Sequence, residues 1–164
     1  MPDRPEFDQQ LRSVGLRVTA PRVAVLDVLH ENPHSTADFV ASGVRERLGR
    51  VSTQTVYDVL HACSEKGLLR KIEPAGSALR YETRTGDNHH HLVCRACGSI
   101  VDIECVVGRA PCLEPDDDHG YLIDEAEVTF WGLCPSCAAG EHQDECLAAD
   151  VGIVGTSGPE QRSY

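Results

Sequence analysis

The sequence predicts an α+β fold in two halves: a helical N-terminal half that ends in a β-hairpin, and a small C-terminal half built on short strands. Three observations carry this prediction. Apolar residues recur at helical spacing as far as Cys63. Two short strand-like runs then flank a Pro/Gly turn, and two Cys-x-x-Cys pairs bracket further strand-like segments. We expect a first domain over residues 1–83, a hinge over 84–88, a second domain over 89–140 and a mobile tail over 141–164.

Charge divides the chain at the same place. The net charge is −11 over 164 residues, which excludes a uniformly basic coat for nucleic acid. Residues 1–80 carry 11 basic and 10 acidic side chains, whereas residues 81–164 carry 4 basic and 16 acidic ones. The two halves are therefore expected to have different roles.

The sequence predicts a cytoplasmic protein with no membrane partner. No run approaches the ~20 apolar residues that cross a bilayer. The start, MPDRPEFDQQLRS, lacks the apolar segment of a signal peptide. In a reducing compartment, the eight cysteines are first of all metal ligands or redox groups.

Three helices are expected in the first 50 residues. The first covers residues 7–14, which place apolar side chains on one face. The second begins after Thr19, whose hydroxyl can cap the free amides, and ends near Pro33. The third runs over residues 35–48, and its inward side chains are Phe39, Val40 and Val44.

A fourth helix and a hairpin complete the N-terminal half. The helix begins at Ser52 and ends at Gly67, and its core stripe is Val56, Val59, Leu60 and Cys63. Residues 68–72 and 78–82 are predicted strands around the turn at 73–77. Three helices, a helix of recognition length and a basic hairpin are the pattern of a winged helix-turn-helix DNA-binding domain.

Three strands are expected in the C-terminal half, over residues 91–94, 99–103 and 121–131. In the last, apolar and polar residues alternate, which is typical of a half-buried strand. We expect the three strands to form an antiparallel sheet, with Phe130 among the inward side chains.

The fourth helix presents side chains that can read DNA. Gln54 can pair with adenine, and Thr53 or Tyr57 can contact a thymine methyl group. The alternative is an ordinary solvated face, with Asp58 orienting a neighbour. Nearby basic residues favour DNA, because they supply phosphate contacts. They are Arg17, Arg22, Arg70, Lys71 and Arg80.

The two Cys-x-x-Cys pairs predict a zinc site. Each pair directs two thiolates at one ion, and two pairs complete a tetrahedral shell. The pairs are Cys94 with Cys97 and Cys134 with Cys137, separated by 36 residues. A thioredoxin-like redox motif is the alternative, but no βαβ pattern surrounds either pair.

Histidines and carboxylates next to the first pair predict a second metal site. On an extended segment, His89 and His91 point the same way. With Asp102, Glu82 and His34 they could supply three imidazoles and two carboxylates, a set that suits Fe(II) or Mn(II). The alternative is a solvated polar segment, and spacing alone does not bring His34 to the others.

Four stretches of the sequence resemble one protein family. They are GLRVTAPRVAVL, VSTQTVYDVL, HHHLVCRACGSIVD and WGLCPSC, and they resemble the ferric uptake regulator (Fur) family of metal-dependent repressors. The resemblance covers residues 11–138. The phrases DNHHHLVCRACG and DEAEVTFWGLCPSC are most similar to FurA/CatR-type members, which are peroxide-responsive repressors of catalase-peroxidase genes.

The resemblance implies a winged-helix domain and a C-terminal α/β dimerisation domain in a homodimer that binds double-stranded operator DNA. It implies structural Zn(II) at the four cysteines and regulatory Fe(II) or Mn(II) at the histidine and carboxylate group. Tyr57 matches the recognition-helix tyrosine, and Arg17 falls where a basic residue reaches the minor groove. Aspartate at position 102, in place of glutamate, is typical of the peroxide-sensing members.

The function that the resemblance implies is a repressor that senses hydrogen peroxide. Fe(II)-catalysed oxidation of His34 or His89 would derepress a catalase-peroxidase gene or the repressor's own gene. A metal-responsive repressor without peroxide sensing is the alternative. Many family members have a further metal site, but those positions here hold Asn88, His90, Arg109 and Ala126, so that ligand set is not expected.

The remaining cysteines leave a redox role open. Cys105 and Cys112 are a candidate redox pair, with ordinary loop or core thiols as the alternative, and Cys146 lies in the tail. Cys63 is expected to pack in the core.

Two other classes of protein fit the sequence less well than a repressor. A zinc deaminase needs H-x-E and P-C-x-x-C, but this chain has no H-x-E, and Cys134 precedes Pro135. Four thiolates also leave no open position for water, so an enzyme is not expected. A metallochaperone is a weaker alternative, which metal-dependent operator binding would exclude.

Overall fold

The computed structural model describes residues 7–74, 76–107, 111–124 and 126–140. The tail expected over residues 141–164 therefore lies outside the described part of the chain. The helices are α1 (Phe7–Ser13), α2 (Ala20–Glu31), α3 (Ala37–Leu48), α4 (Thr53–Glu65) and α5 (Pro135–Ala138). The strands are β1 (Ser35–Thr36), β2 (Arg70–Ile72), β3 (Arg80–Glu82), β4 (His89–Cys94), β5 (Ile100–Glu104) and β6 (Thr129–Gly132). The predicted α+β class is confirmed.

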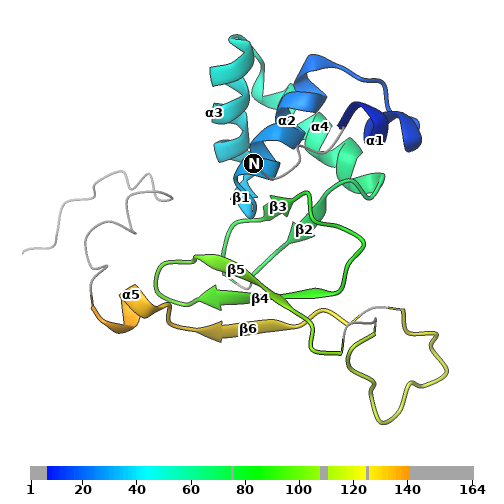
Figure 1. Ribbon diagram of the computed structural model, residues 1–164, viewed down its shortest axis with the longest axis vertical. Helices are drawn as coiled ribbons and strands as arrows, with labels where there is room; N and C mark the ends of the chain where they lie inside the picture. Colours follow the sequence, from blue (N-terminus) through cyan, green and yellow to red (C-terminus); the bar gives the residue numbers. More distant parts are fainter. Residues whose placement is uncertain (1–6, 75, 108–110, 125, 141–164) are drawn as a thin grey trace, which may run out of the picture.

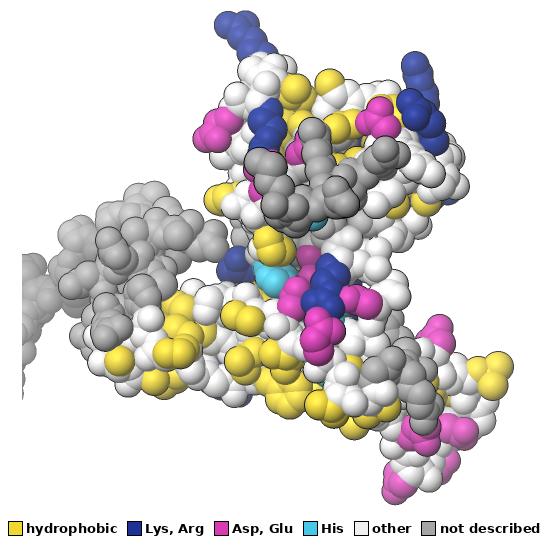
Figure 2. All heavy atoms as spheres, viewed as in Figure 1, with side chains coloured by type: hydrophobic (Ala, Val, Ile, Leu, Met, Phe, Trp, Pro, Cys, Tyr) yellow, Lys and Arg dark blue, Asp and Glu magenta, His cyan; other side chains and the backbone are white. Residues whose placement is uncertain are grey.

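The elements form two halves that lie one above the other in Figure 1, with α1 to α4 over the sheet of β1 to β3, and β4 to β6 below. The same view in Figure 2 shows Lys and Arg side chains at the far end of the helical half. Acidic side chains gather at the far end of the other half, on the loop that contains Asp116, Asp117 and Asp118. The charge division in the sequence is thus also a division in space. No helix among the described residues is long and apolar enough to cross a membrane.

Local sequence determines where the helices begin. The Thr36 hydroxyl accepts a hydrogen bond from the amide of Phe39, and the Ser52 hydroxyl accepts one from the amide of Thr55. Thr36 and Ser52 are therefore the N-caps of α3 and α4. Thr19 also precedes its helix, but its side chain makes no capping hydrogen bond. At that start the sequence relies on proline in the first turn, where a missing amide hydrogen costs nothing.

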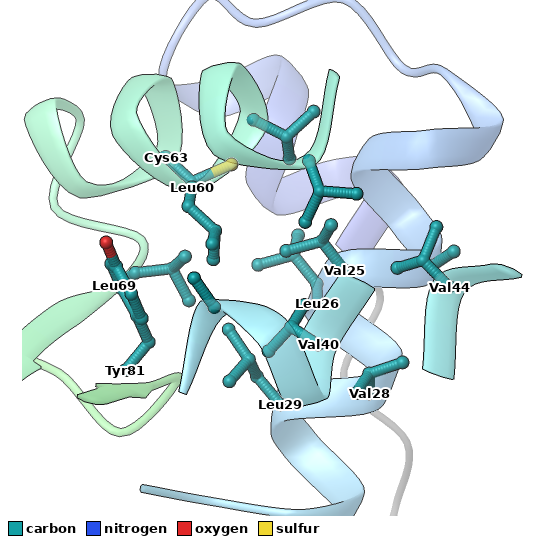
Figure 3. Close-up of a cluster of buried hydrophobic side chains, with 14 of the residues drawn as sticks. Val25, Leu26, Val28, Leu29, Val40, Val44, Leu60, Cys63, Leu69 and Tyr81 are labelled. Atoms are coloured by element: carbon teal, nitrogen blue, oxygen red, sulfur yellow. The ribbon is translucent and has the colours of Figure 1, made fainter. Parts of the chain in front are cut away.

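The core lies between α2, α3 and α4. Figure 3 shows the aliphatic side chains of the three helices meeting, with Leu69 and Tyr81 closing one end. Leu29, Leu60 and Cys63 are fully buried, which confirms the predicted packing role of Cys63. Phe39 is 51% exposed, so its predicted inward position is wrong. Val40 and Val44 fill the buried face of α3 instead.

The first sheet holds one strand more than the predicted hairpin. Its order is β1-β3-β2, with both pairs antiparallel. Ser35 pairs with Tyr81, so the residues expected to begin α3 first form a two-residue strand. This pairing places the turn before α3 beside the C-terminal end of β3.

The second sheet has three strands in the order β5-β4-β6. The β4–β5 pair is antiparallel, but the β4–β6 pair is parallel, so the prediction of a fully antiparallel sheet is wrong. A long crossover separates β5 from β6, and this brings the chain back in the direction of β4. Strand β6 is also shorter than the predicted 121–131. In the parallel register, residue 127 falls opposite His89, where β4 begins, so the residues before 127 have no β4 edge to pair with.

Side chains on one face of this sheet are apolar and in register. Leu92 lies opposite both Val101 and Phe130. They are 42%, 56% and 47% exposed, respectively, so Phe130 does not point inward as predicted. The face is an apolar surface of the described chain.

Candidate metal centre

The junction of the two sheets is built from four elements. His34 lies in the turn before β1, and Glu82 is the last residue of β3. Strand β4 contributes His89 and His91, and β5 contributes Asp102 directly opposite His91. The alternation of β4 directs its two odd-numbered histidines to one side, as the sequence predicted. The pairing of β1 with β3 brings His34 beside Glu82, a contact between segments that periodicity could not join.

Four of these five side chains form one close group. One ligand atom from each of His34, Glu82, His91 and Asp102 lies within 4.8 Å of the others. The Nε2 atom of His34 is 2.7 Å from Asp102 Oδ1 and 3.2 Å from Glu82 Oε2. His91 Nε2 is 3.5 Å from Glu82 Oε1 and 3.6 Å from Asp102 Oδ1. Three of the four residues are buried, and Asp102 forms the half-buried rim.

His89 borders the group and is not a member of it. Its Nε2 atom lies 3.1 Å from Glu82 Oε1 and 3.9 Å from Asp102 Oδ1. Its Nδ1 atom is 2.7 Å from Asp87 Oδ1, which fixes the ring orientation and leaves Nε2 facing the carboxylates. Asp87 is thus a functional residue that sequence reasoning missed. The signal was a carboxylate two residues before a candidate ligand.

Charge and burial perturb the pKa values at the centre in opposite directions. Burial alone would raise the pKa of Glu82, but the close imidazoles of His34 and His91 and the charge of His89 lower it to about 2. Burial alone would lower the pKa of His34, but the close carboxylates of Glu82 and Asp102 raise it above its ordinary value of 6.5. The group therefore favours bound positive charge, whether protons or a cation.

The unpaired atoms at the centre fit a metal ion. Among the described residues, both ring nitrogens of His91 and Glu82 Oε2 are buried without an aligned hydrogen-bond partner. Buried polar atoms are almost always paired, so such a cluster points to an absent ligand. Imidazole nitrogens with carboxylate oxygens are a donor set for a first-row divalent ion.

Arg84 closes the outer side of the centre. Its guanidinium donates to Asp87 and, at 2.7 Å, to Glu104, and it lies 3.7 Å from Asp102 Oδ2. The hydrogen bonds and charges of Glu104 and Asp87 raise the pKa of Arg84 above its ordinary value, although burial lowers it in part. The residue stands in the segment expected to be a hinge, and sequence reasoning assigned it no role. Its ion pairs with Glu104 and Asp102 link that segment to β5.

The four paired cysteines form a second group, at the other end of β4. One sulfur from each of the four lies within 4.8 Å of the others. Cys97 Sγ is 3.8 Å from Cys134 Sγ, and the amide of Cys134 donates to Cys94 Sγ at 3.2 Å. Hydrogen bonds from the amides of Cys97 and Cys134 lower the pKa of Cys94 to about 6, which favours the thiolate. A tetrahedral set of thiolates with amide donors suits zinc.

The predicted DNA-contact residues lie on the helical half. Thr53, Gln54 and Tyr57 are exposed along α4, and Gln54 Nε2 donates to Asp58 Oδ1 at 2.7 Å. Asp58 therefore orients its neighbour, as expected. A shallow depression beside these residues is bordered by Arg17 and Arg22.

The hairpin's basic residues divide between two surfaces. Lys71 is exposed and Arg70 half-buried on β2. Arg80 was expected to face phosphates with them, but its Nη1 donates to the carbonyl of His34 at 3.1 Å. The structure thus uses Arg80 to hold the turn that carries His34.

Cys105 and Cys112, the candidate redox pair, lie near each other and near His90. They are free thiols in this structure. Arg109 and Ala126 stand where many family members have ligands of a further metal site. Arg109 lies outside the described residues. The carbonyl oxygen of Ala126 is 4.0 Å from Cys112 Sγ.

Comparisons with known proteins agree on one family. The model of the ferric uptake regulator family matches residues 13–128. The chain is 56% identical over 134 residues to "Transcriptional regulator FurA" of Mycobacterium tuberculosis, covering 82% of this chain and 91% of that protein. It is 56% identical over 131 residues to "Ferric uptake regulation protein 1" of Mycolicibacterium fortuitum, covering 80% and 81%. These relatives are named as regulators, not as enzymes.

Solved structures share the fold. The ferric uptake regulator of Vibrio cholerae matches with a TM-score of 0.61 at 24% identity, covering 79% of this chain and 100% of that one. At this identity the match speaks for the fold alone. The family model and the two relatives carry the assignment: the chain belongs to the ferric uptake regulator family.

Proposed function

We propose that the chain is a metal-dependent DNA-binding repressor of transcription that works as a homodimer in the cytoplasm. The observation that carries this proposal is the origin of the metal centre's ligands. His34 and Glu82 come from the half that carries α4, whereas His91 and Asp102 come from the second sheet, and the four lie within 4.8 Å of one another. One ion at this centre would belong to both halves at once.

Metal occupancy would then decide how the DNA-binding half is held. Without an ion, His34 and Glu82 are linked to the second sheet through hydrogen bonds and charge with Asp102, His89 and His91. A divalent ion would add direct bonds across the junction and stabilise the arrangement shown in Figure 1. Because it binds this arrangement best, it would shift the population toward the form that grips two half-sites.

The remaining assignments follow the division of the chain. Residues 1–83 would read DNA, 84–88 would act as the hinge, and 89–140 would dimerise and hold metal. Arg17, Arg22, Arg70 and Lys71 would contact phosphates, and Thr53, Gln54 and Tyr57 would contact bases. Zn(II) would occupy the four cysteines as a structural ion, and Fe(II) or Mn(II) would occupy the centre, with His89 as a fifth ligand.

The same centre supplies the route to peroxide sensing that we propose. The residues of the centre would hold Fe(II), which would supply one-electron cleavage of hydrogen peroxide and regain its electron by the end. In the net change, one C–H bond of a ligand imidazole becomes C–OH with one peroxide oxygen, and the other peroxide oxygen leaves as water, so the histidine gains one oxygen atom. His34 and His89 both direct Nε2 into the centre. Loss of either ligand would release the DNA-binding half and derepress a catalase-peroxidase gene or the repressor's own gene.

Two features support peroxide sensing within the family. Aspartate stands at position 102, and the relative from Mycobacterium tuberculosis is named FurA, the type that the sequence resembles. A second candidate function is a metal-responsive repressor without peroxide chemistry. It is favoured by the donor set itself, because imidazole and carboxylate ligands accept Mn(II) as well as Fe(II).

Peroxide titration of DNA binding tests the proposal. The zinc-loaded protein, with either Fe(II) or Mn(II), is bound to the DNA upstream of its own gene and treated with increasing peroxide. We expect the Fe(II) form to lose the DNA and a peptide with His34 or His89 to gain one oxygen atom, while the Mn(II) form keeps the DNA. Equal insensitivity of both forms would establish the second candidate. No sequence-specific binding with either metal would overturn the repressor assignment.

A further inference from the structure

Three side chains outside the two metal groups described above form a further cluster. His90 lies on β4, Cys105 directly follows β5, and Cys112 lies in the crossover that leads to β6. One ligand atom from each lies within 4.8 Å of the other two, and Cys112 Sγ is 3.3 Å from His90 Nε2. Segments far apart in sequence thus bring two thiols and an imidazole to one point.

The surroundings of this cluster are those of a ligand site. His90 is only 8% exposed, and its Nδ1 atom has no hydrogen-bond partner among the described residues. Burial and the neighbouring Cys105 raise the pKa of Cys112, although the side chain of Asn88 lowers it in part. Two thiols and an imidazole whose ligand atoms lie within 4.8 Å of one another can serve a single cation as sulfur and nitrogen ligands.

We propose that His90, Cys105 and Cys112 form a third metal site, which takes a borderline-soft ion, Zn(II). Thiolate with imidazole is a donor set that prefers Zn(II) to Fe(II) or Mn(II), whereas the N/O centre lacks any sulfur. Three protein ligands leave one position of a tetrahedral shell for water. The inference does not depend on DNA binding, so it stands or falls separately from the proposed function.

The position of the site gives it a structural consequence. His90 points to the opposite side of β4 from His89 and His91, because strand side chains alternate. Its ring also lies 6.4 Å from the ring of Phe130 on the exposed apolar face. An ion here would tie the crossover between β5 and β6 to β4, beside that face and directly behind the regulatory ligands.

Cobalt substitution tests the site, because only sulfur-bound Co(II) gives strong near-ultraviolet charge-transfer absorption. The reduced full-length protein, with zinc already at the four paired cysteines, is titrated with Co(II). Co(II) at the N/O centre gives no such band. We expect a sulfur-to-cobalt band that saturates at one equivalent per chain and that added Zn(II) removes. The variant Cys105→Ser/Cys112→Ser should lose the band. His90→Gln removes a ligand, so it should weaken Co(II) binding by at least about tenfold, the smallest loss seen when even a residue that only supports a ligand is removed.

Matched variants distinguish this site from cobalt bound to other thiols. Cys63→Ala removes a buried core thiol and should leave the band unchanged. If Co(II) replaced zinc at the four paired cysteines, the resulting sulfur-to-cobalt band would also appear in the Cys105→Ser/Cys112→Ser variant. Retained Mn(II) binding at the N/O centre shows that each variant is folded. An equal band in the double variant, no band in the native protein, or a Cys105–Cys112 disulfide that persists in metal-loaded protein would each overturn the proposal.

Discussion

At the residue scale, the backbone of His34 shows how firmly the metal centre is built. Its φ is 59°, in the left-handed region that residues other than glycine rarely occupy. Such a conformation costs on the order of 1–3 kcal/mol and persists only where the surroundings hold it. The side chain of Arg80 donates to its carbonyl, and Asp102 lies 2.7 Å from its ring. The strain is thus held in place by contacts from both halves, and it directs an imidazole into the centre.

A first prediction concerns Asp87, which orients His89 without touching the close group of four. Asp87→Asn weakens the hold on His89 Nδ1, so we expect Mn(II) affinity to fall by about 10–100-fold, with little change in the unfolding midpoint. Isothermal titration measures the affinity. The matched control is Asp117→Asn, because Asp117 pairs with His119 Nδ1 at 3.3 Å on the exposed loop. Equal loss of affinity in both variants would refute the positioning role.

A second prediction concerns pH and His34 in protein that carries zinc alone. The folded-state pKa of His34 is raised, so its contribution to stability is complete below the unfolded value of 6.5 and is lost as pH rises through the folded value. Glu82 has the opposite sign, since its contribution is present above 4.5 and is lost only as pH falls toward about 2. The unfolding midpoint of the native protein relative to His34→Ala should therefore decrease between about pH 6 and pH 8.

Metal binding should show the reverse trend over the same interval. An ion must displace the proton from His34, so Mn(II) affinity should increase as pH rises. His61→Ala serves as the control, since that exposed histidine lies on α4, where its Nε2 atom is 3.4 Å from Glu65 Oε1. If Mn(II) affinity still rises with pH in the His34→Ala variant, groups other than His34 cause the pH dependence.

At the element scale, the helices could be predicted and the strand pairing could not. Apolar spacing located the buried stripe of α4, because a core helix repeats its pattern every turn. Strand β1 has two residues and belongs to a sheet only through Tyr81 and Arg80 on β3. The direction of β6 likewise depends on the crossover, which no local pattern encodes. Prediction from the sequence therefore failed where strands pair over long range.

The candidate sites follow the same rule. Cys94 and Cys97 could be assigned together because one tight turn holds both. His34 could be named as a candidate ligand by residue type, but spacing could not bring it to the group, since its neighbours in space are 48 and 68 residues away. The cluster around His90 was missed, because its two cysteines stand at no characteristic spacing and were considered as a redox pair.

A third prediction separates the proposed roles of α4 and β2 in DNA binding. Gln54→Ala should cost about 1–3 kcal/mol at particular operator positions, because base contacts carry the sequence information. Lys71→Ala should weaken binding to all sequences and reduce the salt slope by about 1. Anisotropy titrations at several salt concentrations measure both effects. If Lys71→Ala changes base preference or Gln54→Ala changes the salt slope, the two roles are wrongly assigned.

At the scale of the whole molecule, one apolar face of the second sheet lacks a cover in the described chain. Leu92, Val101 and Phe130 lie in register and are each about half exposed. The proposed homodimer would bury this face, at roughly 25 cal/mol for each Å² removed from water. The half proposed to bind DNA has 11 basic and 10 acidic side chains in residues 1–80, and the acidic excess lies in residues 81–164, so a net charge of −11 does not argue against the proposed DNA binding.

A fourth prediction follows for assembly. Leu92→Glu places a charge at the centre of this face, so we expect the protein to sediment as a monomer and to lose operator binding. Leu48→Glu is the control, because Leu48 is exposed to a similar extent (39%) at the end of α3. Analytical ultracentrifugation at fixed zinc content measures both variants. A Leu92→Glu dimer as stable as the native one would place the interface elsewhere.

In the proposed function, one ion at the centre joins the two halves and thereby controls DNA binding. The most direct test is operator affinity of zinc-loaded protein with and without Mn(II), for the native chain and for His34→Ala. We predict that Mn(II) tightens binding by about 5–150-fold in the native protein, the usual range of allosteric coupling, and has no effect on the variant. Equal affinity with and without Mn(II), or an undiminished response in His34→Ala, would contradict control of DNA binding by an ion at this centre.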